Sequence, residues 1–171
     1  EQESERLARI TENLLRLTRL DSGMLPEAQR VDLSSVMAHV VRMLRLVAEE
    51  KQVDLSCEIR REGQTLASED EIHEIIYNLT ENAIKYNRPQ GRVDVSVENG
   101  EDTVTLRVAD TGIGIPPEHR SRVFERFYRV DKSRSKAVGG TGLGLSIVKH
   151  AALIHHAKLE LDSAVGVGTT I

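Results

Sequence analysis

The chain has 171 residues, of which 39% are hydrophobic and 29% are charged, and its formal net charge is −4. This length suits one globular domain with a short appendage, and the apolar fraction disfavours a wholly disordered chain. Tryptophan is absent, aromatic residues make up only 3%, and lysine and arginine form no dense block, which disfavours nucleic-acid binding.

The first predicted element is a helix that runs from about Leu7 to about residues 21–23. Its apolar side chains recur at steps of three and four residues, at Leu7, Ile10, Leu14 and Leu17. This spacing is typical of a coiled-coil seam, and also of an amphipathic helix that packs against a core. The helix is predicted to end near Gly23, and residues 24–30 to form a linker, because Gly23 and Pro26 both discourage helix.

The middle of the chain predicts alternating helices and strands. Apolar spacing indicates helices at about residues 32–50 and 69–86, with an alternating strand at 53–59 between them. Alternating valines predict a hairpin over residues 93–108, with its turn at Asn99-Gly100.

The C-terminal part predicts a helix at about residues 142–156, followed by strands at 159–161 and 167–171. Strands joined as hairpins, rather than in regular βαβ repeats, favour an α+β sandwich over a doubly wound parallel sheet. The fold class predicted from the residues is therefore α+β.

One face of the predicted helix at 69–86 carries polar side chains. Asn78 and Asn82 are four residues apart and Lys85 lies three further on, so the three share a face. Amide oxygens can coordinate Mg²⁺, and an ammonium group can bind phosphate oxygens. A solvated polar face would give the same pattern, so this segment alone leaves both interpretations open.

A second polar feature lies at the end of the predicted hairpin. The strand runs directly into Asp110, which Gly112 and Gly114 follow. Glycine allows another group to approach the backbone closely, and a carboxylate at a strand end could accept a hydrogen bond from an exocyclic amine such as that of adenine. A simple glycine turn with an aspartate cap is the alternative.

The third feature is a glycine-rich loop, residues 139–144, that opens an apolar helix. Free amides at a helix N-terminus attract anions. The loop lacks the Gly-Lys-Ser/Thr of a P-loop, and no strand precedes it as a Rossmann fingerprint requires. The polar residues 131–137 before it fit a lid over a nucleotide.

In their order and spacing, these three motifs closely resemble the N, G1 and G2 boxes of the Bergerat-fold ATP-binding domain. That superfamily includes gyrase, mismatch-repair ATPases, the ninety-kilodalton heat-shock chaperone and sensor histidine kinases. Residues 124–129 resemble the F box peculiar to histidine kinases, and residues 7–23 are similar to the end of their dimerisation hairpin. The resemblance implies a two-layer α/β sandwich, a mixed sheet with helices on one face, preceded by a helical segment. It assigns residues 1–25 to the dimerisation and phosphoacceptor hairpin with its linker, and 26–171 to the catalytic ATP-binding domain.

The resemblance also implies a role for each matching residue. Asn82 would bind Mg²⁺, while Asn78 and Lys85 would be catalytic, contacting the metal or the phosphates of ATP. Asp110 would bind the adenine amino group. The whole implied nucleotide site comprises Asn78, Asn82, Lys85, Tyr86, Asp110, Gly112, Gly114, Ile115, Thr141, Gly142, Leu143, Gly144 and Thr169. The two F-box phenylalanines would anchor the base of the lid or pack in the core.

The implied activity is phosphoryl transfer from ATP to a histidine, with Mg²⁺ offsetting charge on the transferring group. In the family the acceptor lies on the first dimerisation helix, before an acidic residue and a Thr/Asn-Pro pair. None of the six histidines here has that context, and His73-Glu74 lacks the rest of it. We therefore expect ATP binding without self-phosphorylation. The implied partners are a second copy, through the dimerisation helices, and the receiver domain of a response regulator.

Other branches of the superfamily are alternatives. A hydrolytic Bergerat ATPase carries a glutamate four residues before the metal-binding asparagine, where this chain has Asn78, an amide that cannot act as a general base. A degenerate nucleotide-binding scaffold is disfavoured by the intact Asn82 and Asp110. Anti-sigma serine kinases lack the F box and the dimerisation segment.

The chain begins at Glu1 without a methionine and ends in a predicted strand, so we expect a fragment of a longer protein. No apolar run reaches the roughly 20 residues of a membrane-spanning helix, so this segment is expected to make no membrane contact. Cys57 is the only cysteine, which excludes a disulfide framework and favours a reducing compartment. The predicted location is cytoplasmic, within a parent that the resemblance allows to be an inner- or plasma-membrane sensor.

Overall fold

The computed structural model describes three continuous ranges, residues 27–60, 64–130 and 141–171. It also describes seven residues before them, Ser4, Leu7, Ala8, Thr11, Leu14, Leu15 and Thr18. The predicted lid segment at 131–137 and the first part of the glycine-rich loop lie outside the described residues.

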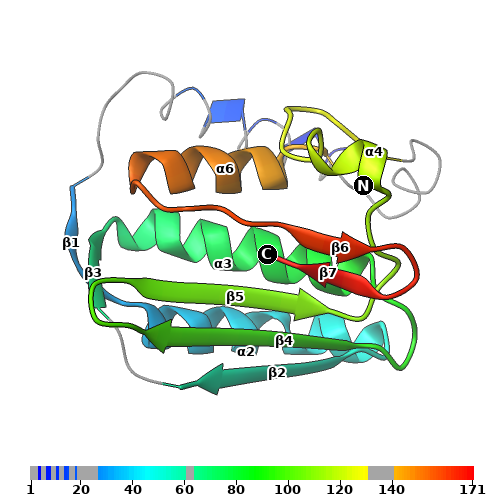
Figure 1. Cartoon of the computed structure of the whole chain (residues 1–171), viewed down its shortest axis with the longest axis horizontal. Helices are drawn as coiled ribbons and strands as arrows, with labels where there is room; N and C mark the ends of the chain where they lie inside the picture. The colour runs from blue at the N-terminus through cyan, green and yellow to red at the C-terminus, as the bar shows by residue number, and fades with distance from the viewer. Residues whose placement is uncertain are drawn as a thin grey trace.

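A five-stranded mixed sheet forms one layer of the domain (Figure 1). Its strands, in spatial order, are β2 (Asp54–Ile59), β4 (Arg92–Asn99), β5 (Val104–Asp110), β7 (Gly168–Thr170) and β6 (Asp162–Ala164). The first two strands pair in parallel and every other pair is antiparallel. A separate pair, β1 (Gln29–Asp32) and β3 (Gln64–Ala67), is antiparallel.

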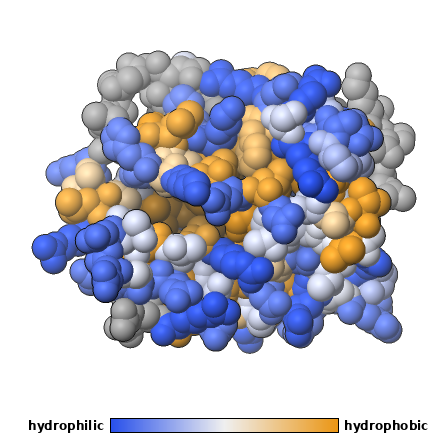
Figure 2. Space-filling view, viewed as in Figure 1, coloured by the Kyte–Doolittle hydropathy of each residue, from blue (hydrophilic) through white to orange (hydrophobic). Residues whose placement is uncertain are grey.

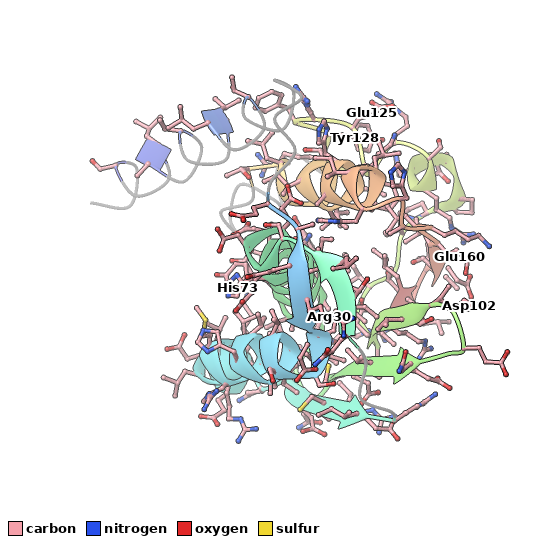
Figure 3. All side chains as sticks on the ribbon, turned by 90° about the vertical axis from the view of Figure 1, so that its left-hand side faces the viewer. Arg30, His73, Asp102, Glu125, Tyr128 and Glu160 are labelled. Carbon is pink, nitrogen blue, oxygen red and sulfur yellow. The ribbon has the colours of Figure 1, made fainter. Side chains whose placement is uncertain are left out.

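Helices form the second layer. They are α2 (Leu33–Glu50), α3 (Glu69–Lys85) and α6 (Gly144–Ile154), with a short α4 (Pro117–Arg120) after the β5 loop. The first two pack against the sheet and α6 packs on α3, so these three long helices lie to one side of the sheet when the molecule is seen edge-on (Figure 3). The predicted α+β two-layer sandwich is therefore confirmed.

The core lies between these layers. The Asp32 carboxylate begins α2 by accepting a hydrogen bond from the Ser34 backbone N–H at 3.0 Å. The apolar stripes of α2 and α3 then meet alternate residues of β4. Side chains buried there without solvent contact include Met37, Val40, Ile76, Ile84, Val93, Val95 and Val97. On the face in Figure 2, apolar side chains also gather between α6 and the strands, within a largely hydrophilic rim.

The predicted helices at 32–50 and 69–86 and the strand at 53–59 agree with α2, α3 and β2 to within a few residues. The predicted hairpin is also present, but its turn differs. Asn99 is still paired, with Val104, and the loop is closed by the Gly100 N–H, which donates to the Thr103 carbonyl at 2.7 Å. The loop is therefore four residues long, and Asn99 belongs to the strand.

Three further predictions need correction. The predicted linker at 24–30 is wrong at its end, because Gln29 and Arg30 are paired in β1, and β3 was not predicted. The predicted strand at 159–161 is also wrong, because pairing begins at Asp162. The half-buried Leu159 packs on the core instead, so its apolar character reflects contact with the core and not strand pairing.

The seven described residues before position 27 are all helical; six of them lie in the helix predicted from about Leu7 to about residues 21–23, and Ser4 lies before it. The seam residues Leu7 and Leu14 are exposed, while Ile10 and Leu17 lie outside the described residues. The domain boundary predicted at residue 25 also lies outside them and stays a prediction. In the part of the chain that the structure describes, no helix is long and apolar enough to cross a membrane.

Candidate functional site

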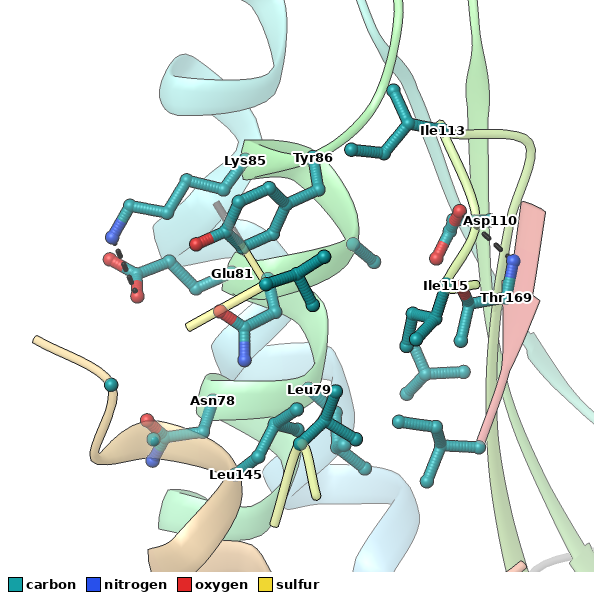
Figure 4. Close-up of a pocket in the computed structure, with 18 of the residues that line it drawn as sticks. Asn78, Leu79, Glu81, Lys85, Tyr86, Asp110, Ile113, Ile115, Leu145 and Thr169 are labelled. Carbon is teal, nitrogen blue, oxygen red and sulfur yellow. Dashed lines mark hydrogen bonds and ion pairs between the residues drawn. The ribbon is translucent and has the colours of Figure 1, made fainter. Parts of the chain in front are cut away.

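A cavity of about 750 Å³ opens between α3 and the β5–β7 side of the sheet. In Figure 4, Asn78 and Lys85 of α3 and Tyr86, which directly follows it, line one wall, and Asp110 and Thr169 line the wall opposite. The start of α6 and the segment after α4 contribute to its rim. Residues far apart in the sequence thus meet around one open cavity.

Asp110 is the last residue of β5 and projects toward this space. Its Oδ1 accepts hydrogen bonds from the backbone N–H groups of Gly112, at 2.7 Å, and Thr169, at 3.2 Å. Its Oδ2 accepts none from any residue that the structure describes. Burial raises the pKa of the Asp110 carboxyl, and the two N–H groups offset part of that rise. The wall therefore presents one free, partly buried acceptor to a ligand.

The glycines after Asp110 are needed for packing within the chain. A Cβ added at Gly112 would lie 2.5 Å from the Tyr86 carbonyl oxygen. At Gly114, where φ is +70°, it would lie 2.0 Å from the Ala164 carbonyl oxygen. The close approach predicted for these glycines is real, but the group that approaches is protein backbone.

The α3 wall carries both engaged and free polar groups. The Asn78 amide donates to the Glu74 carbonyl at 2.8 Å, and its Oδ1 lies 2.6 Å from where a Cβ on Gly144 would be. Lys85 pairs with Glu81, with 3.4 Å between Nζ and Oε2. The half-buried Asn82 also lines the cavity, and its side chain makes no hydrogen bond to a described residue.

The structure brings most of the predicted site residues together. Those that line the cavity are Asn78, Asn82, Lys85, Tyr86, Asp110, Gly114, Ile115, Thr141, Gly142, Gly144 and Thr169. Two do not. Gly112 is buried behind the wall, and Leu143 is fully buried against Ile147, so their roles in a site would be indirect.

Arg129 lines the cavity and was not predicted as a site residue. Its Nε and Nη2 atoms are buried and have no hydrogen-bond partner in the described part of the chain. Leaving buried, charged donors unpaired is costly, so such a group favours an anionic ligand. Its position at the end of the F box was the only signal in the sequence.

Of the F-box phenylalanines, Phe124 is half-buried and Phe127 is 56% exposed. Of the two alternatives, core packing is therefore excluded for Phe127. Its backbone N–H donates to the Gly142 carbonyl at 2.8 Å, which joins the two sides of the segment at 131–140. This bond agrees with the expectation that the F box anchors the base of the predicted lid.

Comparisons with known proteins agree with this arrangement. A family model described as "Histidine kinase-, DNA gyrase B-, and HSP90-like ATPase" matches residues 67–171. The sensor-like histidine kinase SenX3 of Mycolicibacterium smegmatis is 38% identical over 169 residues, which are 98% of this chain and 44% of the relative. The chain spans less than half the length of the first curated relatives that it matches.

Two solved structures give the same result. The mycobacterial sensor histidine kinase MprB is 29% identical with a TM-score of 0.72, over 84% of this chain and 93% of that one. Full-length ShkA in complex with AMPPNP is 26% identical with a TM-score of 0.85, over 98% of this chain and 35% of that one. The chain therefore belongs to the histidine kinase-, DNA gyrase B- and HSP90-like ATPase family, as the ATP-binding catalytic domain of a sensor histidine kinase.

Proposed function

We propose that the cavity binds ATP together with Mg²⁺, and that the domain transfers the γ-phosphoryl group to a histidine outside this chain. One observation carries the proposal: among the described residues, Asp110 Oδ2 and the Nε and Nη2 atoms of Arg129 have no hydrogen-bond partner, and both residues line the same cavity. The carboxylate suits the amino group of adenine and the guanidinium suits phosphate. The similarity to ShkA, whose structure is described as a complex with AMPPNP, gives independent support.

The base of ATP would lie at the Asp110 end. There the Oδ2 atom would accept a hydrogen bond from the adenine amine, and the side chains of Ile113 and Ile115 supply apolar surface for the ring. Such sites combine mostly apolar walls with a few directed polar groups. Tyr86, on the opposite wall (Figure 4), would pack beside the nucleotide.

The phosphates would lie between Arg129, Lys85 and the N-terminus of α6. Thr141, Gly142 and Gly144 line the cavity at that helix end, where free backbone N–H groups and the helix dipole attract anions. Lys85 is already paired with Glu81, so the phosphates would compete with that carboxylate. At the Nε and Nη2 atoms of Arg129, the phosphates would displace no hydrogen-bond partner from the described residues.

Asn82 is the proposed ligand of Mg²⁺. Its amide oxygen is free of hydrogen bonds to the described residues, and the residue lines the cavity between Asn78 and Lys85 on α3. Mg²⁺ keeps several waters and binds few protein groups when phosphates supply the remaining oxygens. A single amide therefore fits a metal that arrives with the nucleotide, and Mg²⁺ would supply neutralisation of the phosphate charge.

The proposed catalysis consists of holding and orienting ATP. Phosphoryl transfer needs little covalent chemistry from the protein, so positioning and charge stabilisation supply most of the rate enhancement. Lys85 and Arg129 would stabilise the negative oxygens of the transferring group, and Asn78 would fix the start of α6 through its contact at Gly144. Asn78 is an amide that could not activate water, which disfavours hydrolysis.

From the family membership we propose three partners: the histidine that receives the phosphoryl group, a second copy of the parent protein, and the receiver domain of a response regulator. A cytoplasmic location is proposed on the same ground. In the reaction, the bond between the γ-phosphorus and the β–γ bridging oxygen would break as the bond to the histidine nitrogen forms. ADP would leave.

Calorimetric titration of the 171-residue chain with a non-hydrolysable ATP analogue tests the binding step. We expect binding that is strengthened by Mg²⁺ and abolished in Asp110→Asn. A histidine-phosphorylation assay with radiolabelled ATP should give no product from the chain alone, and product when a dimerisation hairpin of a related kinase is added. A folded chain that binds no adenine nucleotide with or without Mg²⁺ would contradict the proposal.

A further inference from the structure

Ser163, in β6, lies behind the Asp110 end of the cavity. It is 4% exposed and does not line the cavity. Its hydroxyl oxygen has three neighbours at hydrogen-bond distance: the Ile115 backbone nitrogen at 2.8 Å, the Gly168 carbonyl oxygen at 3.0 Å and Thr169 Oγ1 at 2.8 Å. This number of partners fills the capacity of a hydroxyl, which has one proton and two lone pairs.

The direction of each bond follows by elimination. The Ile115 N–H can only donate and the Gly168 carbonyl can only accept. Ser163 therefore donates its single proton to Gly168, and its two lone pairs accept from Ile115 and from a third donor. That donor is the Thr169 hydroxyl. The proton of Thr169 consequently points away from the cavity, toward Ser163.

Thr169 lines the cavity next to Asp110, on the neighbouring strand. The two residues are paired across β5 and β7, and the Thr169 N–H is already donated to Asp110 Oδ1. Paired residues of adjacent antiparallel strands hold their side chains on the same face of the sheet and close together. The base end of the cavity therefore presents two adjacent oxygens, Thr169 Oγ1 and Asp110 Oδ2, that both accept hydrogen bonds and do not donate.

Three of the neighbouring backbone donors are engaged as well. The N–H groups of Gly112, Ile113 and Ile115 donate to Asp110, to the Tyr86 carbonyl and to Ser163. An exocyclic amine, with two N–H donors, matches a pair of acceptors. A 6-oxo group offers only lone pairs and would leave these acceptors unpaired, which is the kind of mismatch that discriminates strongly between ligands.

We propose that Ser163 is a positioning residue for base selectivity: by holding the hydroxyl proton of Thr169, it keeps Thr169 Oγ1 an acceptor beside Asp110 Oδ2 and so selects against 6-oxopurine nucleotides. This inference rests on the proposed binding of ATP and adds the residue that enforces the choice of base. Ser163 acts through Thr169 and does not contact the nucleotide.

The test is a double-mutant cycle on the 171-residue chain, with dissociation constants for ATP and ITP measured by calorimetry. In Ser163→Ala the Thr169 proton is free to turn toward a 6-oxo group, and we expect the preference for ATP over ITP to fall about tenfold. Thr169→Val has nearly the same shape and no hydroxyl. In that background, adding Ser163→Ala should leave the preference unchanged within about twofold.

The cycle separates this role from a structural one. Loss of the acceptor for the Ile115 N–H would weaken both nucleotides together and would not move their ratio. The inference would be overturned if Ser163→Ala left the ratio of the ATP and ITP dissociation constants unchanged. It would also be overturned if Ser163→Ala changed that ratio equally in the unmutated chain and in the Thr169→Val variant. Failure of the unmutated chain to bind either nucleotide would instead overturn the proposed function.

A ligand series provides a second test that needs no variant. Purine riboside triphosphate has no substituent at position 6, so it lacks both the amine of ATP and the oxygen of ITP. We expect its affinity for the unmutated chain to lie between those of ATP and ITP. If ITP binds as tightly as purine riboside triphosphate, the wall does not reject the oxygen and the inference is wrong.

Discussion

Lys85 and Glu81 form an ion pair across one turn of α3, inside the wall of the cavity, with 3.4 Å between Nζ and Oε2. Only 16% and 27% of the two side chains are exposed. The ammonium group proposed to bind phosphate thus has an anionic partner within the chain. A bound triphosphate would have to displace or share that partner.

We expect Glu81→Gln to tighten ATP binding by about three- to tenfold, because it removes a negative charge beside the phosphates and releases Lys85. Adenosine has no phosphates, so its affinity should not change. Calorimetric titration with both ligands measures this difference. Equal gains for adenosine and ATP would mean that Glu81 acts on the base end, contrary to the proposed orientation of the nucleotide.

Arg129→Met tests the phosphate end directly. Because the buried Nε and Nη2 atoms have no partner among the described residues, removing the charge should cost little stability. It should weaken ATP binding by about ten- to a hundredfold, as expected for a charge-assisted hydrogen bond.

Arg60→Met is the matched control for Arg129→Met. Arg60 carries the same charge but is exposed just beyond β2, where it pairs with Glu58 and Glu98. We expect the Arg60→Met variant to bind ATP with the same affinity as the unmutated chain. Similar losses in the two variants would show that net charge, and not a contact in the cavity, governs binding.

Asp110→Asn is expected to separate stability from binding. Burial raises the pKa of the Asp110 carboxyl above its ordinary value, so folding favours its protonated form. The associated stability is present below the ordinary aspartate pKa of 3.8 and is lost as the pH rises through the higher pKa of the folded state. At neutral pH the ionised carboxylate therefore opposes folding.

An asparagine at this position keeps an oxygen for the N–H groups of Gly112 and Thr169 and avoids the buried charge. We expect Asp110→Asn to raise the melting temperature of the nucleotide-free chain at neutral pH, and to raise it less as the pH approaches the ordinary aspartate pKa. ATP binding should fall at least about a hundredfold, because a donor would replace the free acceptor. A lower melting temperature at neutral pH would contradict the role assigned to burial.

The sequence predicts α3, and which of its residues face the cavity, because both signals are local. The apolar spacing that buries Ile76 and Ile84 also sets which residues face the other way, so Asn78 and Asn82 had to share a side of the helix. Leu143 is the contrasting case. Its place in the glycine-rich loop suggested a nucleotide contact, but its apolar side chain is fully buried against Ile147.

What the sequence does not predict depends on contacts between distant segments. The strands β1 and β3 have four residues each and pair across more than thirty positions of chain, so neither shows a repeating pattern of its own. Arg129 becomes a site residue only because folding buries its guanidinium beside the cavity. Ser163 likewise gains its three partners from β7 and from the loop after β5.

Two glycines allow the cost of backbone strain to be separated from the cost of a steric collision when a side chain is added. Gly114 and Gly166 both have left-handed backbone conformations, with φ of +70° and +77°. A Cβ at Gly114 would lie 2.0 Å from the Ala164 carbonyl oxygen, whereas a Cβ at Gly166 would have nothing within 4 Å. An alanine would strain the backbone in the same way at both positions, but it would collide with Ala164 only at Gly114.

We therefore expect Gly166→Ala to lower the free energy of unfolding by about 1–2 kcal/mol, the cost of placing a Cβ in the left-handed region. Gly114→Ala should lower it by at least about 3 kcal/mol, because the loop after β5 must also move away from β6. Urea denaturation of both variants measures the difference. Equal losses would mean that the contact between Gly114 and Ala164 is not maintained in solution. The loop that holds Asp110 and Ile115 would then be less firmly fixed than the selectivity argument for Ser163 requires.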